Sequence, residues 1–113
     1  MQMSACCAIL ACAVLAGSPG CAINAEPDFD SAVPQDRFRA IREAKAERDT
    51  DALPDLVRQL GSDDALVRLA AIDALQAITD QRLGFAPHAA ELERQAGIDR
   101  WISWLETREE AME

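Results

Sequence analysis

The sequence predicts an all-α protein, and three observations support this. Half of the 113 residues are apolar, but only 4% are aromatic and Tyr is absent. Chains rich in Ala and Leu favour close-packed helices, whereas sheets accumulate β-branched and aromatic residues. Apolar residues beyond residue 34 recur at helical spacing. All four cysteines lie in the first 21 residues, so disulfides cannot hold the remainder together.

The chain is strongly acidic. There are 20 acidic and 11 basic residues, a net charge of −9, and none of them lies in residues 1–25. An acidic surface repels the phosphate backbone, and nucleic-acid-binding proteins normally present a basic patch. We therefore expect no nucleic-acid partner.

The N-terminal segment is typical of an export signal. Residues 5–16 form an unbroken apolar run, followed by the helix-breaking sequence GSPG and then Cys21. A transmembrane helix needs roughly 20 apolar residues, whereas the core of a signal peptide needs only about 7 to 15. We therefore predict that residues 1–20 are a signal peptide and that the protein is exported.

The small residues before Cys21 resemble the lipobox of bacterial lipoproteins. The resemblance implies cleavage before Cys21, a diacylglycerol on its sulfur, and a protein anchored in a membrane of the cell envelope. Ser18 departs from the aliphatic residue that the family prefers at its position. If Cys12 were the lipidated residue, the apolar core before it would be too short for a signal peptide. Ordinary cleavage, after Ala16 or Ala25, is the alternative and would give a soluble periplasmic or secreted protein.

Residues 21–33 read as a flexible tether. They mix Pro, Asp, Ser and Asn and show no helical period. Asp28 and Asp30 lack the central Gly and terminal Glu of a calcium-binding loop, so we assign them to a solvated linker. The helical domain is then expected over residues 34–110.

A first amphipathic helix is expected over residues 35–48. This stretch contains no Gly or Pro, and Pro34 suits a first helical turn. Phe38, Ile41 and Ala44 share one third of the helical circumference. They should form the buried face.

A second helix should run from about residue 52 to residue 60. The polar residues 49–51 can cap it, and Pro54 suits its first turn. Gly61 is expected to close the helix in the left-handed conformation. One apolar stripe comprises Leu53, Leu56, Val57 and Leu60.

A third helix is expected over residues 64–79, capped by Ser62, Asp63 or Asp64. It is apolar nearly all round, which is typical of a helix buried from several sides. Its exposed edge should hold the polar residues Asp64, Arg68, Asp73 and Gln76.

Residues 80–89 contain Gly84 and Pro87 and predict a loop, with Leu83 and Phe85 turned back onto the core. A last helix is expected over residues 90–110, weakened at Gly97. Its docking stripe is predicted to be Ile98, Trp101, Ile102 and Leu105. Trp101 and, less clearly, Trp104 are assigned to the core rather than to a ligand-stacking face.

The run LPDLVRQLGSDDALVRLAAIDALQAI, residues 53–78, resembles a HEAT repeat of the bacterial type, with Pro54, Asp64 and Arg68 at its repeat positions. The resemblance implies antiparallel helical hairpins, about four helices in all. It also implies structural roles for Asp64 and Arg68, which in the family bond to one another or to neighbouring hairpins. Residues 78–105 are similar to a tail found on some bacterial HEAT-repeat lipoproteins. Arrays commonly need three or more repeats, so the end helices should act as caps.

No catalytic, cofactor-binding or metal site is predicted. His88 is the only histidine, and a zinc site there would need several carboxylates. Ser62 and Ser103 lack a neighbouring histidine, and capping or surface roles explain them. The acid pairs at 63–64 and 109–110 are assigned to capping and solvation.

HEAT arrays usually serve as interaction surfaces, so the resemblance implies a protein partner and no enzymatic activity, cofactor or small-molecule substrate. A small structural envelope lipoprotein is the first alternative. A relative of HEAT-like bilin lyases is the second, and it rests on the family association alone.

Overall fold

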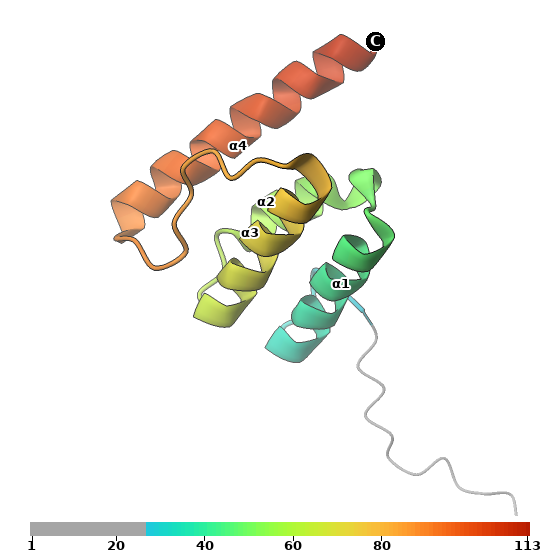
Figure 1. Cartoon of the computed structure of the whole chain (residues 1–113). Coiled ribbons are helices and arrows are strands. Elements are labelled where there is room, and N and C mark those ends of the chain that lie inside the picture. The colour runs from blue at the N-terminus through green and yellow to red at the C-terminus, as the bar shows by residue number, and fades with distance from the viewer. Residues whose placement is uncertain (1–26) are drawn as a thin grey trace, which may run out of the picture.

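The computed structural model describes residues 27–113, and this part of the chain is all-helical (Figure 1). The α-helices are α1 (Pro34–Glu47), α2 (Leu53–Gln59), α3 (Ala65–Thr79) and α4 (Glu91–Met112), and a 3₁₀ turn, η1 (Thr50–Ala52), leads into α2. The predicted all-α class is confirmed, and the helices begin and end close to the predicted residues. The expected signal peptide and Cys21 lie outside the described residues.

Side-chain and backbone caps set the helix ends. Asp64 Oδ1 accepts hydrogen bonds from the backbone N–H groups of Leu66 (2.8 Å) and Val67 (3.2 Å), which have no partner inside α3. Asp49 Oδ1 accepts from the N–H of Asp51 at 2.9 Å before α2. The prediction for Gly61 is wrong: among the described glycines only Gly84 has a positive φ.

Neighbouring helices pack in pairs, some antiparallel and some parallel. α1 lies beside α3 and runs in the same direction, and α2 packs against α3 after the short turn at residues 60–64 (Figure 1). α4 crosses the other side of α2. Burial of each large apolar side chain contributes about 1.5–3 kcal/mol. The largest fully buried side chains come from all four helices and their ends: Ile41, Leu53, Leu56, Leu60, Val67, Ile72, Leu75 and Trp101.

The loop between α3 and α4 folds back onto the core, as predicted. Phe85 is only 3% exposed and Leu83 is partly buried against the core. The N–H of Phe85 donates to the Arg82 carbonyl oxygen at 3.1 Å, and the two central residues, Leu83 (φ 53°) and Gly84 (φ 72°), both have positive φ, as in a type I′ turn. Trp101 Nε1 donates to the same carbonyl at 3.1 Å, so the turn is tied to α4.

The contact face of α4 differs from the predicted stripe. Gly97 and Trp101 are buried, and Ile98, Trp104 and Leu105 are partly buried. Ile102 is 43% exposed. One residue advances a helix by about 100°, which turns Ile102 away from the side on which Trp101 meets the body.

Residues 27–33 require a further correction, because they contact the body and do not form part of a free tether. Phe29 packs against the core, and its carbonyl oxygen accepts a hydrogen bond from Gln59 Nε2 at 2.9 Å. Asp30 pairs with Arg58 at 2.8 Å. Hydrogen bonds to Asp30 and then to Asp55 raise the pKa of the Arg58 guanidinium above its usual value. The folded body therefore begins ahead of α1.

Candidate functional site

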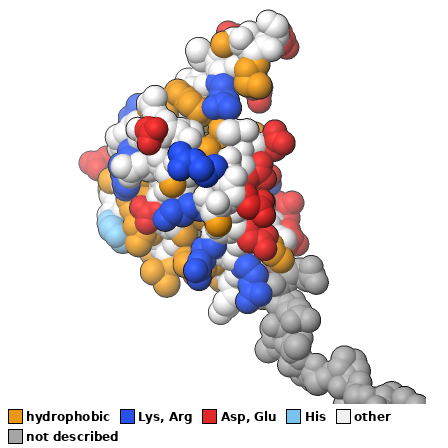
Figure 2. Space-filling view, turned by 45° about the vertical axis from the view of Figure 1, so that its right-hand side comes forward, with side chains coloured by type: hydrophobic (Ala, Val, Ile, Leu, Met, Phe, Trp, Pro, Cys, Tyr) orange, Lys and Arg blue, Asp and Glu red, His pale blue; other side chains and the backbone are white. Residues whose placement is uncertain are grey.

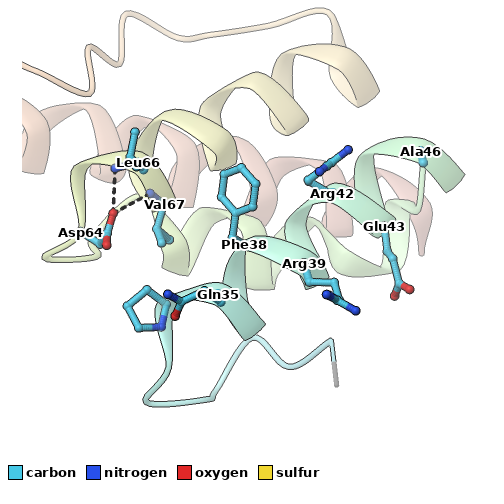
Figure 3. A pocket seen from close by; sticks show the side chains of 10 residues that line it. Gln35, Phe38, Arg39, Arg42, Glu43, Ala46, Asp64, Leu66 and Val67 are labelled. Carbon is cyan, nitrogen blue, oxygen red and sulfur yellow. Dashed lines mark hydrogen bonds between the residues drawn. The ribbon is translucent and has the colours of Figure 1, made fainter. Parts of the chain in front are cut away.

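A groove lies between α1 and the start of α3, and we call it the α1/α3 groove (Figure 3). Its volume is 710 Å³ and it is open to solvent. Phe38 projects from α1 toward Leu66 and Val67 of α3 (Figure 3). Phe38 is 37% exposed and Leu66 is 68% exposed. The groove thus presents large apolar side chains to solvent.

The geometry of the two helices explains why these side chains are uncovered. On α1, Ala40, Ile41 and Ala44 are buried, and the neighbouring side of the helix faces solvent and bears Phe38. On α3, the Asp64 cap starts the helix at Ala65, so Leu66 falls in an outer first turn. These two uncovered sides border the groove.

Basic side chains flank the apolar part of the groove. Arg39 and Arg42 line it from α1, and both are exposed. Within residues 27–113 neither arginine forms a salt bridge; the ion pairs there involve Arg58 and Arg82. Glu43 also lines the groove, while the carboxylate of Asp64 is engaged as a helix cap. The charged side chains that line the groove are therefore two basic and two acidic, on a protein of net charge −9.

Arg68 bonds to backbone carbonyl oxygens and not to Asp64, which was one of the two kinds of partner that the resemblance implies. It is buried, not part of an exposed edge, and it does not pair with the Asp64 carboxylate. Its Nη1 donates to the carbonyl oxygens of Ser62 (2.8 Å) and Asp63 (3.1 Å), and its Nε donates to that of Pro87 (3.2 Å). Arg68 therefore joins the α2–α3 turn to the loop before α4.

Pro54 lies in the first turn of α2, as predicted. Of the repeat positions named from sequence, Asp64 alone borders the α1/α3 groove. Cys21, the predicted lipid attachment site, lies outside the described residues. Pro54 and Arg68 thus lie away from the groove, whose surface consists mainly of other side chains.

The other residues weighed for chemistry lie apart from one another. His88 and Ser103 are exposed. The Ser62 hydroxyl accepts a hydrogen bond from the Asp64 N–H at 3.1 Å in the turn before α3, while Asp64 itself caps that helix. Over residues 27–113, no three His, Cys, Asp or Glu side chains gather in an arrangement suited to a metal ion.

The two tryptophans pack against each other. Trp101 is fully buried, as predicted, and meets Trp104 edge to face, with ring centroids 5.4 Å apart and planes at 72°. The Arg108 guanidinium lies 5.6 Å from the centre of the Trp104 ring, within cation–π range. These contacts assign the pair to holding α4 in place.

Sequence reasoning missed the groove. Phe38 was assigned to a buried stripe, and Leu66 to a helix buried all round. The available signal was the spacing of Phe38, Arg39 and Arg42, which places two arginines beside an aromatic residue on one side of α1.

The fold and the groove define a small all-α protein built on a helical hairpin with an open surface groove lined by apolar and charged side chains. Comparison of the chain with protein-family models, curated proteins and solved structures found no match. None of the helices between residues 27 and 113 combines the length and apolar character needed to cross a bilayer.

Proposed function

We propose that this chain is an exported protein, held at an envelope membrane by a lipid on Cys21, and that its helical body binds another protein. The α1/α3 groove carries the proposal. It exposes Phe38 and Leu66 beside charged side chains of both signs, whereas the largest core side chains are fully buried. Exposed apolar surface rimmed by polar groups is typical of protein docking sites.

The helix arrangement supports a short HEAT-type array as the scaffold for this groove. In such an array, helices of successive hairpins stack in two layers. Here α1 packs beside α3, and α4 packs beside α2, around the α2–α3 hairpin. Residues 27–33 cover α2 through Phe29 and so act as a cap at one end of the array.

The test is site-specific photocrosslinking of the full chain in the producing cells. A photoreactive residue at Leu66 lies in the α1/α3 groove, and a matched probe at Leu92, 85% exposed on α4, lies outside it. We expect protein adducts from Leu66 and none from Leu92. Phe38→Asp, which puts a charge into the groove, should reduce the Leu66 adduct. Absence of any adduct from Leu66 would refute a protein-binding groove.

A further inference from the structure

Residues 28–31 are fixed to the first turn of α1, close to the α1/α3 groove. The N–H of Asp28 donates to the carbonyl oxygen of Asp36 at 3.3 Å, and the Ser31 hydroxyl donates to the Asp36 carboxylate at 2.7 Å. Asp36 directly follows Pro34 and Gln35, which line one end of the groove. The chain therefore enters the folded body within one helical turn of that end of the groove.

Contacts with α2 hold the same segment from another side. Phe29 packs against the core, and its carbonyl oxygen accepts a hydrogen bond from Gln59 Nε2 at 2.9 Å. Asp30 pairs with Arg58 at 2.8 Å. Apolar burial and hydrogen bonding both favour the docked segment over a free one. In the folded protein, only the residues ahead of Asp28 are then available as a tether.

The docked segment sets a short distance between the proposed lipid anchor and the groove. Asp28 is the seventh residue after Cys21. A fully extended chain spans at most about 3.6 Å per residue, so these two residues lie no more than about 25 Å apart. A chain that was free as far as Pro34 would span about 45 Å. Docking of residues 28–31 therefore keeps the groove close to the membrane surface.

This distance, rather than charge, restricts the partner. The groove carries Arg39 and Arg42 as well as Glu43 and Asp64, so its charges favour neither an acidic nor a basic occupant. Two molecules confined to one membrane surface meet at a raised effective concentration. The loops that adjoin the membrane-spanning segments of another protein are confined in this way, whereas a freely diffusing protein is not.

We infer that the α1/α3 groove binds a loop of a membrane-embedded protein, next to one of its spanning segments and at the membrane surface that holds Cys21. This inference rests on the proposed anchor and protein-binding groove, and it names the class of partner for that groove. Residues 28–31 act as a fixed spacer that keeps the groove within reach of such a loop.

The experiment lengthens the tether of the full chain and leaves the groove unchanged. About twenty Gly and Ser residues are inserted between Ala25 and Glu26 in the chain that carries the photoreactive residue at Leu66. Effective concentration falls with about the −3/2 power of tether length, so going from about 7 to about 27 residues should lower the adduct roughly five- to tenfold. The same insertion after Glu113 is the matched control, because it adds chain away from the anchor, and should leave the adduct unchanged.

The position of the adduct on the partner gives a second readout. We expect the crosslinked peptide of the partner to fall in a loop that adjoins a membrane-spanning segment. A probe at Met112, which is 75% exposed, should give no adduct with that protein. Met112 lies in the last turns of α4, which project beyond the body at the top of Figure 2, on the side opposite residue 27.

The outcomes separate this inference from the proposed function. A Leu66 adduct with a protein that is not embedded in the membrane would overturn the inference and leave protein binding supported. The same holds for an adduct that the insertion after Ala25 leaves unchanged, or that both insertions lower equally. Adducts with lipid alone, or no adduct from Leu66, would overturn both the inference and the protein-binding groove.

Discussion

At the scale of single residues, Arg68 shows how a buried cation is held without a carboxylate. Its guanidinium donates to three backbone carbonyl oxygens from two separate segments, the turn at Ser62 and Asp63 and the loop at Pro87. The repeat pattern correctly indicates a structural role for Arg68. It could not identify Pro87 as a partner, because that contact depends on how the later loop folds back.

We predict that Arg68→Met lowers the free energy of unfolding by about 2–4 kcal/mol, since hydrogen bonds to a charged group are strong and the carbonyls would lose their donor. Urea unfolding of residues 26–113 measures this. Arg82→Met is the control: Arg82 pairs with Asp73 on the surface at 3.6 Å, and its loss should change the stability by less than about 1 kcal/mol. Equal effects of the two substitutions would contradict the assigned role.

A glycine occupies position 97 because α4 and the loop before it approach each other closely there. A Cβ there would lie 2.8 Å from Phe85 Cδ2 and 3.2 Å from Phe85 Cα. The sequence shows only that a glycine weakens the helix, by about 0.5–1 kcal/mol relative to Ala. The contact with Phe85 explains why this weak helix former occupies the position.

We therefore predict that Gly97→Ala destabilises the protein by a net 1–2 kcal/mol or so, because the overpacking cost exceeds the gain in helix propensity. Thermal unfolding of residues 26–113 checks the sign. Gly61→Ala serves as the matched control, since its nearest new contact is the Arg58 carbonyl oxygen at 3.4 Å. Its effect should stay within about 1 kcal/mol and be neutral or stabilising. Stabilisation by Gly97→Ala would show that Phe85 can move aside.

At the scale of elements, capping residues and apolar spacing were enough to predict all four helices. Pro34, Pro54 and Asp64 act locally, so their effects can be read from neighbouring residues alone. The exposure of individual side chains was harder to predict. Ile102 and Phe38 lie on apolar sides of their helices that are wider than the surface covering them. Periodicity gives the side of a helix that is apolar, and the packed fold decides how much of it is buried.

Residues 27–33 offer the clearest test at this scale. A tether would tolerate substitution, whereas the packing of the Phe29 side chain against the core predicts a loss. The hydrogen bond from Gln59 goes to the backbone carbonyl of residue 29 and is kept in the Ala variant. We expect Phe29→Ala to lower the free energy of unfolding by about 1–2 kcal/mol, less than the roughly 3–5 kcal/mol of a fully buried Phe. Val33→Ala, at a position 48% exposed, should stay within about 0.5 kcal/mol in the same urea measurement. Identical stability of the two variants would restore the tether interpretation for these residues.

At the scale of the whole molecule, the groove could not be predicted from sequence. Phe38 and Leu66 lie on helices that α2 separates in the sequence, and only the packing of α1 against α3 brings the two residues to one surface. The projection of the last turns of α4 likewise follows from where α4 meets α2, which no local pattern encodes.

The attachment of the whole molecule to a membrane depends on one thiol. If Cys21 carries a diacylglycerol, the chain should sediment with membranes, because each buried CH₂ contributes about 0.8 kcal/mol and two or more acyl chains hold a protein lastingly. We predict that Cys21→Ser moves the exported chain to the soluble fraction and abolishes a lipid mass shift at the mature N-terminus. Cys12→Ser, within the apolar run, should leave both unchanged. Ordinary signal cleavage makes the opposite prediction: the parent chain and both variants would be equally soluble, and the groove would then meet its partner free of the bilayer.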